Sequence, residues 1–98
     1  MSNVDAAELV RLVEIAKRAI EADEMERLAK IEQADLNTAY QDFKDERCLA
    51  HVDGGTAEWD RMMAATKAEY LSAEEAKRKA YNAKRRLKTA IDRHHRAA

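Results

Sequence analysis

Apolar residues in the first half of the chain recur at the spacing of a helix. Leu9, Val13, Ala16 and Ile20 follow one another at intervals of four, three and four residues, which predicts one face of an amphipathic helix. The row then resumes at Leu28, Ile31, Asp35 or Leu36, Ala39 and Phe43. Three further apolar positions, Val10, Leu12 and Ile15, widen the stripe beyond what contact with one helix requires, so we expect more than one neighbour.

The second half shows an alternating spacing of four and three, which is typical of a heptad pattern in a coiled coil. Its members are Trp59, Met63, Thr66, Tyr70, Ala73, Lys77 or Ala76, Ala80, Lys84 or Ala83, Leu87, Ile91 and His94. Beyond Leu71 the apolar positions are mostly alanine, which buries little area per residue. We therefore expect this end of the pairing to be held less firmly than the end near Trp59.

One segment near the middle, "HVDGGTAEW" (residues 51–59), separates the two patterns and contains both glycines of the chain. Gly54 is expected just past a helix end, where a positive φ is needed. Thr56 is expected to cap the next helix. The sequence thus predicts a single helical domain over residues 1–98, with a first arm over about 3–52, a turn at 53–56 and a second arm over about 57–95.

The first arm is predicted as one long helix or as two or three segments. Ser2 or Asn3 is a cap candidate at its start, whereas "EADEME" (21–26) and "DLNT" (35–38) weaken the pattern. Asp23 with Glu26 could form a capping box. Because neither Gly nor Pro occurs before residue 54, mostly continuous helix is favoured.

The fold class that follows is all-α: an antiparallel helical hairpin of two long helices, the first arm in one or several segments. A lone pair of helices in a chain of 98 residues buries too little apolar surface to be more than marginally stable. We therefore expect self-association into a homodimeric helical bundle, which would also cover the extra apolar positions.

Charge is distributed unevenly along the chain, although the net charge is only −1. Residues 1–60 hold 15 acidic and 7 basic side chains, and residues 61–98 hold 4 acidic and 11 basic ones. The small net charge argues against bulk electrostatic binding to any partner, but the asymmetry favours attraction between the two arms.

The basic segment, residues 77–96, holds nine Lys or Arg and one acid. On a helical wheel of ~100° per residue these nine lie outside an arc of small and apolar residues. They are Lys77, Arg78, Lys79, Lys84, Arg85, Arg86, Lys88, Arg93 and Arg96. Three uses follow: charge matching within the molecule or an oligomer, binding of an acidic protein, or binding of nucleic acid phosphates with Tyr81 stacking on a base.

Internal matching is the favoured use, because a turn near residue 54 sets the acids of the first arm level with the basic segment. The acidic face of Glu21, Asp23, Glu24 and Glu26 is placed roughly opposite Lys88, Arg86, Arg85 and Ala83. Such exposed pairs are individually weak but together can fix orientation and register. The basic arc is too broad for one acidic helix to cover, so some cations are expected to remain for another partner.

The richest apolar cluster of the sequence lies around the turn, where Trp59, Met62, Met63 and Tyr70 meet Phe43, Leu49 and Val52. The favoured interpretation is the core of the hairpin. The alternative is a partly exposed anchor for a partner, since Trp is enriched at interface hot spots and Met adapts to irregular surfaces.

Nothing in the sequence predicts an enzyme, a cofactor or a metal site. Cys48 and His51 form a single C-x-x-H with Asp53 following, which falls short of the ligand set of a zinc site. A lone cysteine permits no internal disulfide, and the start "MSNVDAAELV" has no signal-peptide pattern. With no apolar run of ~20 residues, we expect no membrane partner and a cytoplasmic protein.

These observations favour a non-enzymatic helical protein that binds and modulates or inhibits a larger macromolecular partner, most simply a protein. In size and composition the chain resembles the small charged proteins with which phages and mobile elements inhibit host machinery, including anti-CRISPR proteins. That resemblance implies inhibition by occlusion and assigns no residue. The alternative hypothesis is a nucleic-acid-binding protein that uses the basic C-terminal helix.

Overall fold

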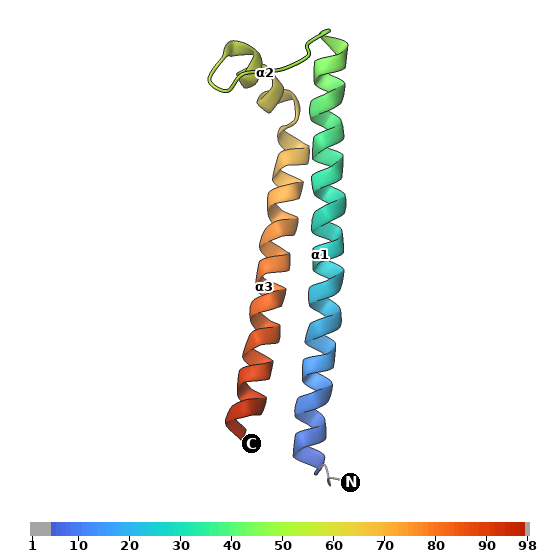
Figure 1. The fold of residues 1–98 in the computed structure, drawn as a ribbon, viewed down its shortest axis with the longest axis vertical. Helices are drawn as coiled ribbons and strands as arrows, with labels where there is room; N and C mark the ends of the chain where they lie inside the picture. The colour runs from blue at the N-terminus through green and yellow to red at the C-terminus, as the bar shows by residue number, and fades with distance from the viewer. Residues whose placement is uncertain (1–4, 98) are drawn as a thin grey trace.

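The computed structural model describes residues 5–97, which form three helices and a rod of 66 × 20 × 18 Å. Helix α1 (Ala6–Glu46) and helix α3 (Lys67–Ala97) run antiparallel, side by side, and the short α2 (Ala57–Ala65) lies at the tip (Figure 1). The predicted all-α helical hairpin is thereby confirmed. None of the described helices carries an apolar stretch long enough to cross a bilayer.

Helix α1 is one uninterrupted helix of 41 residues. It begins after Asp5, whose carboxylate accepts a hydrogen bond of 2.7 Å from the backbone N–H of Glu8. The predicted caps at residues 2 and 3 lie outside the described residues. The segment 21–26 does not break the helix, because Asp23 pairs with Arg27 one turn further on, at 2.9 Å, rather than forming a capping box.

Helix α1 ends at Glu46, earlier than the predicted end of the first arm at residue 52. The cause is a Schellman motif: the N–H of Leu49 donates to Lys44 O (2.8 Å) and that of Cys48 to Asp45 O (3.2 Å). Cys48 takes the left-handed position of this motif, with φ of 55°. The sequence prediction that Gly54 ends the helix is wrong, and the glycine with positive φ is Gly55 (79°).

The second arm consists of two helices, not one. Thr56 caps α2 as predicted, accepting a hydrogen bond of 3.2 Å from the N–H of Trp59. The break follows at Thr66, which is buried and whose hydroxyl donates to Met62 O at 2.7 Å. A threonine hydroxyl that bonds back to the previous turn commonly bends a helix, and α3 then restarts at Lys67.

The apolar core lies at the tip, where the sequence placed its richest cluster. Phe43, Val52 and Met62 are buried, and Leu49 and Trp59 are half-buried against them. Along the rod, α3 contributes a row of buried small side chains, the alanine seam: Ala73, Ala76, Ala80, Ala83 and Ala90. Alanine, not Lys77 or Lys84, therefore occupies the inward heptad positions.

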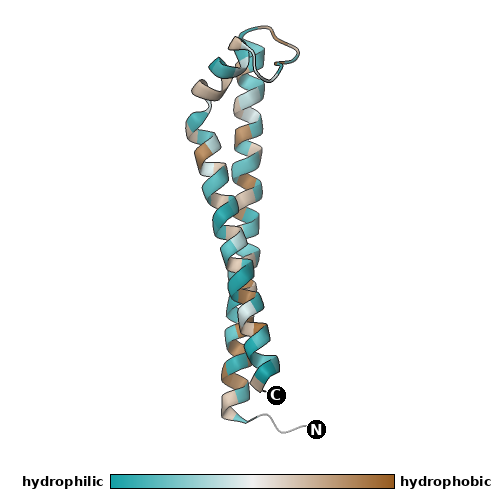
Figure 2. Cartoon of the chain, turned by 90° about the vertical axis from the view of Figure 1, so that its left-hand side faces the viewer, coloured by the Kyte–Doolittle hydropathy of each residue, from teal (hydrophilic) through white to brown (hydrophobic). Residues whose placement is uncertain are grey.

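The first part of the predicted apolar row, from Leu9 to Ile31, does not face α3, whereas Leu36 and Phe43 at its end are buried. Leu9, Val13 and Ile20 are 56%, 45% and 60% exposed, and Figure 2 shows apolar residues along this lower part of α1. Ala22 is buried instead, with Ile15 half-buried on the same side. An α1–α3 contact through Leu9, Val13 and Ile20 is therefore wrong.

The observed rotation of α1 brings small residues into the contact and places acidic residues at its edges. In the observed rotation Ala22 faces the alanine seam, and small residues on both sides let the helices approach closely. Glu21 and Glu26 then flank the contact, where each forms an ion pair with α3.

Candidate interaction surface

The outer face of α3 carries the basic segment. Each of its nine Lys and Arg side chains is exposed, while the alanine seam of the same helix is buried. The separation arises from the sequence itself, because small and basic residues alternate at helical spacing. The predicted amphipathic helix with a broad basic back is therefore present.

Three of the nine cations are paired within α3. Lys77 lies 3.3 Å from Glu74, Arg78 2.5 Å from Glu75, and Lys88 3.6 Å from Asp92. The hydrogen bond from Arg78 lowers the pKa of Glu75. Glu74 and Glu75 each precede their cation by three residues, a spacing at which side chains of a helix meet.

Two more cations pair with α1 and fix the register of the hairpin. Glu21 binds Arg86, two residues from the predicted level at Lys88, and Glu26 lies 2.5 Å from Lys84, next to the predicted Ala83. The hydrogen bond from Arg86, followed by that from Arg18, lowers the pKa of Glu21. The predicted charge match between the acidic cluster and the basic segment is thereby confirmed in its placement.

The remaining predicted acids do not contact α3 in this way. Asp23 pairs with Arg27 on α1, and Glu24 has no cation within 4 Å among residues 5–97. Both side chains are exposed. The acidic face is therefore split, with half of it turned to α3 and half turned to solvent.

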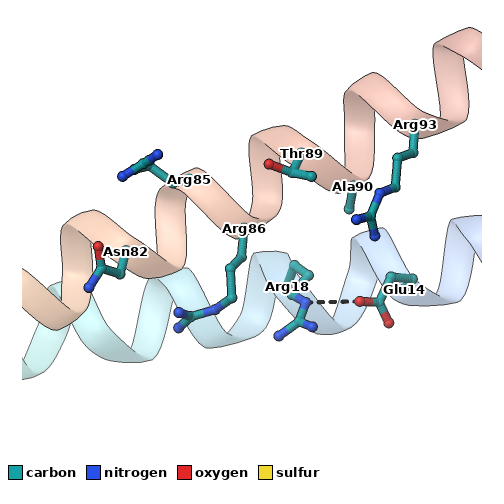
Figure 3. A pocket seen from close by; sticks show the side chains of 8 residues that line it. All are labelled: Glu14, Arg18, Asn82, Arg85, Arg86, Thr89, Ala90 and Arg93. Carbon is teal, nitrogen blue, oxygen red and sulfur yellow. Dashed lines mark hydrogen bonds and ion pairs between the residues drawn. The ribbon is translucent and has the colours of Figure 1, made fainter.

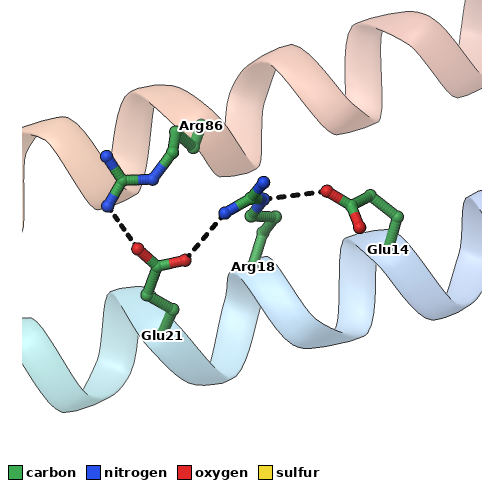
Figure 4. A network of polar contacts seen from close by, with 4 residues as sticks. All are labelled: Glu14, Arg18, Glu21 and Arg86. Atoms are coloured by element: carbon green, nitrogen blue, oxygen red, sulfur yellow. Dashed lines mark hydrogen bonds and ion pairs between the residues drawn. The ribbon is translucent and has the colours of Figure 1, made fainter.

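A chain of alternating charges joins the two helices near Glu21. Arg18 lies between Glu14 (2.9 Å) and Glu21 (3.1 Å), and Glu21 also binds Arg86 (Figure 4). These bonds, led by the one to Glu21, raise the pKa of Arg18. Arg18 was not among the residues predicted from the sequence, although its spacing of four from Glu14 is typical of a helical ion pair.

An arginine-lined groove of about 350 Å³ opens between α1 and α3 beside this chain. Arg18, Arg86 and Arg93 reach into the space between the helices, and Arg85 points away from α1 (Figure 3). Glu14 is the acidic side chain in its wall, and the other lining residues are Asn82, Thr89 and Ala90. Arg18 and Arg86 are bound to Glu14 and Glu21, so Arg85 and Arg93 are the two lining arginines without a carboxylate within 4 Å among residues 5–97.

Four cations of the basic segment have no carboxylate within 4 Å among the residues that the structure describes. They form the unpaired basic set: Lys79, Arg85, Arg93 and Arg96. The guanidinium of Arg85 lies 5.8 Å from the ring centre of Tyr81, which is 63% exposed. The predicted excess of basic residues over acidic partners is therefore present in these four residues.

The predicted apolar interface residues at the tip belong largely to the core. Met62 is buried, Trp59 packs against it, and Met63 accepts a contact of 3.9 Å from the Tyr40 hydroxyl. Burial, the main cause, raises the pKa of Tyr40. Tyr70 is 38% exposed. The structure thus favours the packing role for this cluster, and a role in binding a partner stays a prediction.

The cysteine and histidines are scattered over the rod. Cys48 is exposed, and His51 pairs with Asp53 at 3.0 Å near the tip. His94 and His95 contact each other at the far end of α3, with ring centres 5.9 Å apart. Within residues 5–97 no three His, Cys, Asp or Glu side chains gather as metal ligands.

No protein-family model matches this sequence, and neither a curated protein nor a solved structure matches it. Function must therefore be inferred from the residues themselves.

Proposed function

We propose that the protein is a non-enzymatic interaction module that binds an acidic surface of a larger protein through the outer face of α3. The unpaired basic set supports this proposal. Its four cations have no carboxylate within 4 Å among residues 5–97, whereas the other five cations of the basic segment each have one. Binding would occlude the partner's surface sterically and electrostatically and so modulate or inhibit it.

The hairpin itself provides an example of the proposed mode of binding. Glu21 and Glu26 of α1 bind Arg86 and Lys84 with helical spacing between the acids. Arg85, Arg93 and Arg96 continue the same kind of surface over ~16 Å of α3, at ~1.5 Å per residue. An acidic helix of a partner would meet a similar arrangement, and arginine binds carboxylates through two parallel hydrogen bonds.

A second candidate function is binding of single-stranded nucleic acid, which one observation favours. Tyr81 is exposed next to Arg85, and an aromatic ring beside an arginine is a common platform for a nucleic-acid base. Protein is preferred because cations of α3 already bind carboxylates of a neighbouring helix, Arg86 binding Glu21 and Lys84 binding Glu26.

The test is affinity capture with three versions of the full chain as bait. The first is the unaltered protein, and the second replaces the unpaired basic set by glutamine (K79Q, R85Q, R93Q, R96Q). The third, the matched control, carries K30Q, R47Q, R61Q and K67Q, which remove four exposed cations outside the basic segment. Each bait is incubated with a cell lysate, once with nuclease added and once without.

We expect a protein that is retained by the unaltered chain and the control and lost from the second bait. Retention should fall as salt rises, because exposed charges are screened. A partner bound equally by all three baits would contradict the proposal. Retention that is lost when nuclease is added would instead support binding of nucleic acid.

A further inference from the structure

The outward face of α1 carries an apolar row that no part of the described chain covers. We define the outward apolar row as Leu9, Leu12, Val13, Ala16 and Ile20. Its four large members are 39–60% exposed. On a helix of ~100° per residue the row lies roughly opposite Ala22, which faces α3. An apolar stripe on the solvent side of a helix is typical of an interface.

We propose that this face pairs with the same face of a second copy, with the two α1 helices antiparallel and the two-fold axis near Ile20. The proposal concerns a surface on the opposite helix from the unpaired basic set and does not depend on the proposed function. The partner is a second copy of this chain because the apolar and charged residues of the face complement each other across this axis.

The apolar residues match across the proposed axis. Ile20 meets Ile20 of the second copy, and Leu9 lies level with Ile31 of the second copy. Ile31 is 57% exposed on the same face. Val13 comes level with Arg27, whose aliphatic stem can cover it while its guanidinium stays on Asp23. An axis centred within residues 9–20 would instead leave Ile31 uncovered.

The charges at the edge of the row match as well. Lys17 and Glu24 are exposed on one flank of the face, and neither has an oppositely charged group within 4 Å among residues 5–97. With Ile20 on the axis, Lys17 lies level with residue 23 of the second copy and one residue, ~1.5 Å along the helix, from Glu24. The long Lys17 side chain can reach Glu24 over this offset, and the symmetry repeats the pair. A parallel arrangement would set each of these charges level with its own copy.

The size of the contact indicates a weak dimer. From Leu9 to Ile31 the two helices would touch over ~33 Å, with one helix from each side. Such a contact falls at the low end of specific interfaces. In the dimer the two α3 helices lie on the outside, so both unpaired basic sets remain exposed.

Sedimentation velocity over a range of protein concentrations tests the proposal. We expect the unaltered chain to shift from monomer to dimer as its concentration rises. I20E places two carboxylates together at the axis and should abolish the dimer. The matched control is L71E, which changes a leucine of similar exposure (54%) on α3 and should leave the dimer intact. Far-UV circular dichroism checks that both variants remain helical.

A charge exchange tests the register. K17E should weaken the dimer at least tenfold, because it creates two like-charge pairs, and K17E with E24K should restore it. Oxidation of I20C in a C48S background should give a covalent dimer, whereas L71C should not. A chain that stays monomeric at all concentrations, or an I20E variant that dimerises like the unaltered chain, would overturn the proposal.

Discussion

At the scale of single residues, a few side chains decide where the helices begin and end. Asp5 and Thr56 accept hydrogen bonds from backbone N–H groups at two helix starts. Thr66 bonds back to Met62 and separates α2 from α3. The most unusual position is Cys48, which ends α1 in a left-handed conformation. This conformation is unfavourable for an L residue that has a Cβ atom.

Replacing Cys48 by glycine is expected to stabilise the protein. Glycine takes a positive φ without the clash of a Cβ atom, and the gain exceeds its larger entropy loss on folding. We expect the free energy of unfolding in urea to rise by about 0.5–1 kcal/mol. C48A is the control, because it removes the thiol but keeps the Cβ atom, and should change little. Equal effects of C48G and C48A would show that the backbone conformation is not the cause.

At the scale of elements, the pairing of α1 with α3 depends on small residues in the contact and on ion pairs at its edges. The alanine seam brings the helices close but buries little area. Glu21 and Glu26 bind α3 across the contact. Although each exposed pair contributes little, the two hold the register on which the unpaired basic set depends.

Stability should therefore depend on the ionisation of Glu21. Its pKa is lower in the folded chain than the ordinary value of 4.5, so its contribution is fully present above pH 4.5 and is lost as pH falls through the folded pKa. We expect E21Q to lower the melting temperature near neutral pH and to match the unaltered chain in strong acid. D42N, which changes an exposed acid of α1, serves as the control. A difference that persists unchanged in strong acid would exclude the ion pair as its source.

At the scale of the whole molecule, the rod presents two unlike surfaces. The outer face of α3 is basic, and the outward face of α1 is apolar near its start. The proposed functions divide between them: α3 binds an acidic partner, and α1 binds a second copy. A dimer would present two basic faces, which raises the effective affinity for a partner with repeated acidic sites.

The sequence predicted the hairpin, the tip core and the level of the charge match from local patterns. It did not predict which face of α1 meets α3, nor where α1 ends. The spacing of Leu9, Val13 and Ile20 indicated a contact face, but periodicity does not say which neighbour covers it. The end of α1 was predicted too late because glycine readily adopts a positive φ and cysteine does not. Gly54 was therefore expected to end the helix, and Cys48 was not. The arginine groove depends on Arg18 and could not be located before the rotation of α1 was known.

The rotation of α1 determines both which cations of α3 find a carboxylate and which face of α1 is left for the dimer contact. Thiol labelling rates of I20C and A22C, each in a C48S background, measure it directly. We predict that position 22 is protected at every protein concentration, whereas position 20 reacts rapidly in dilute solution and becomes protected only as the concentration rises. Rapid labelling at position 22 with protection at position 20 in dilute solution would show that α1 has the opposite rotation.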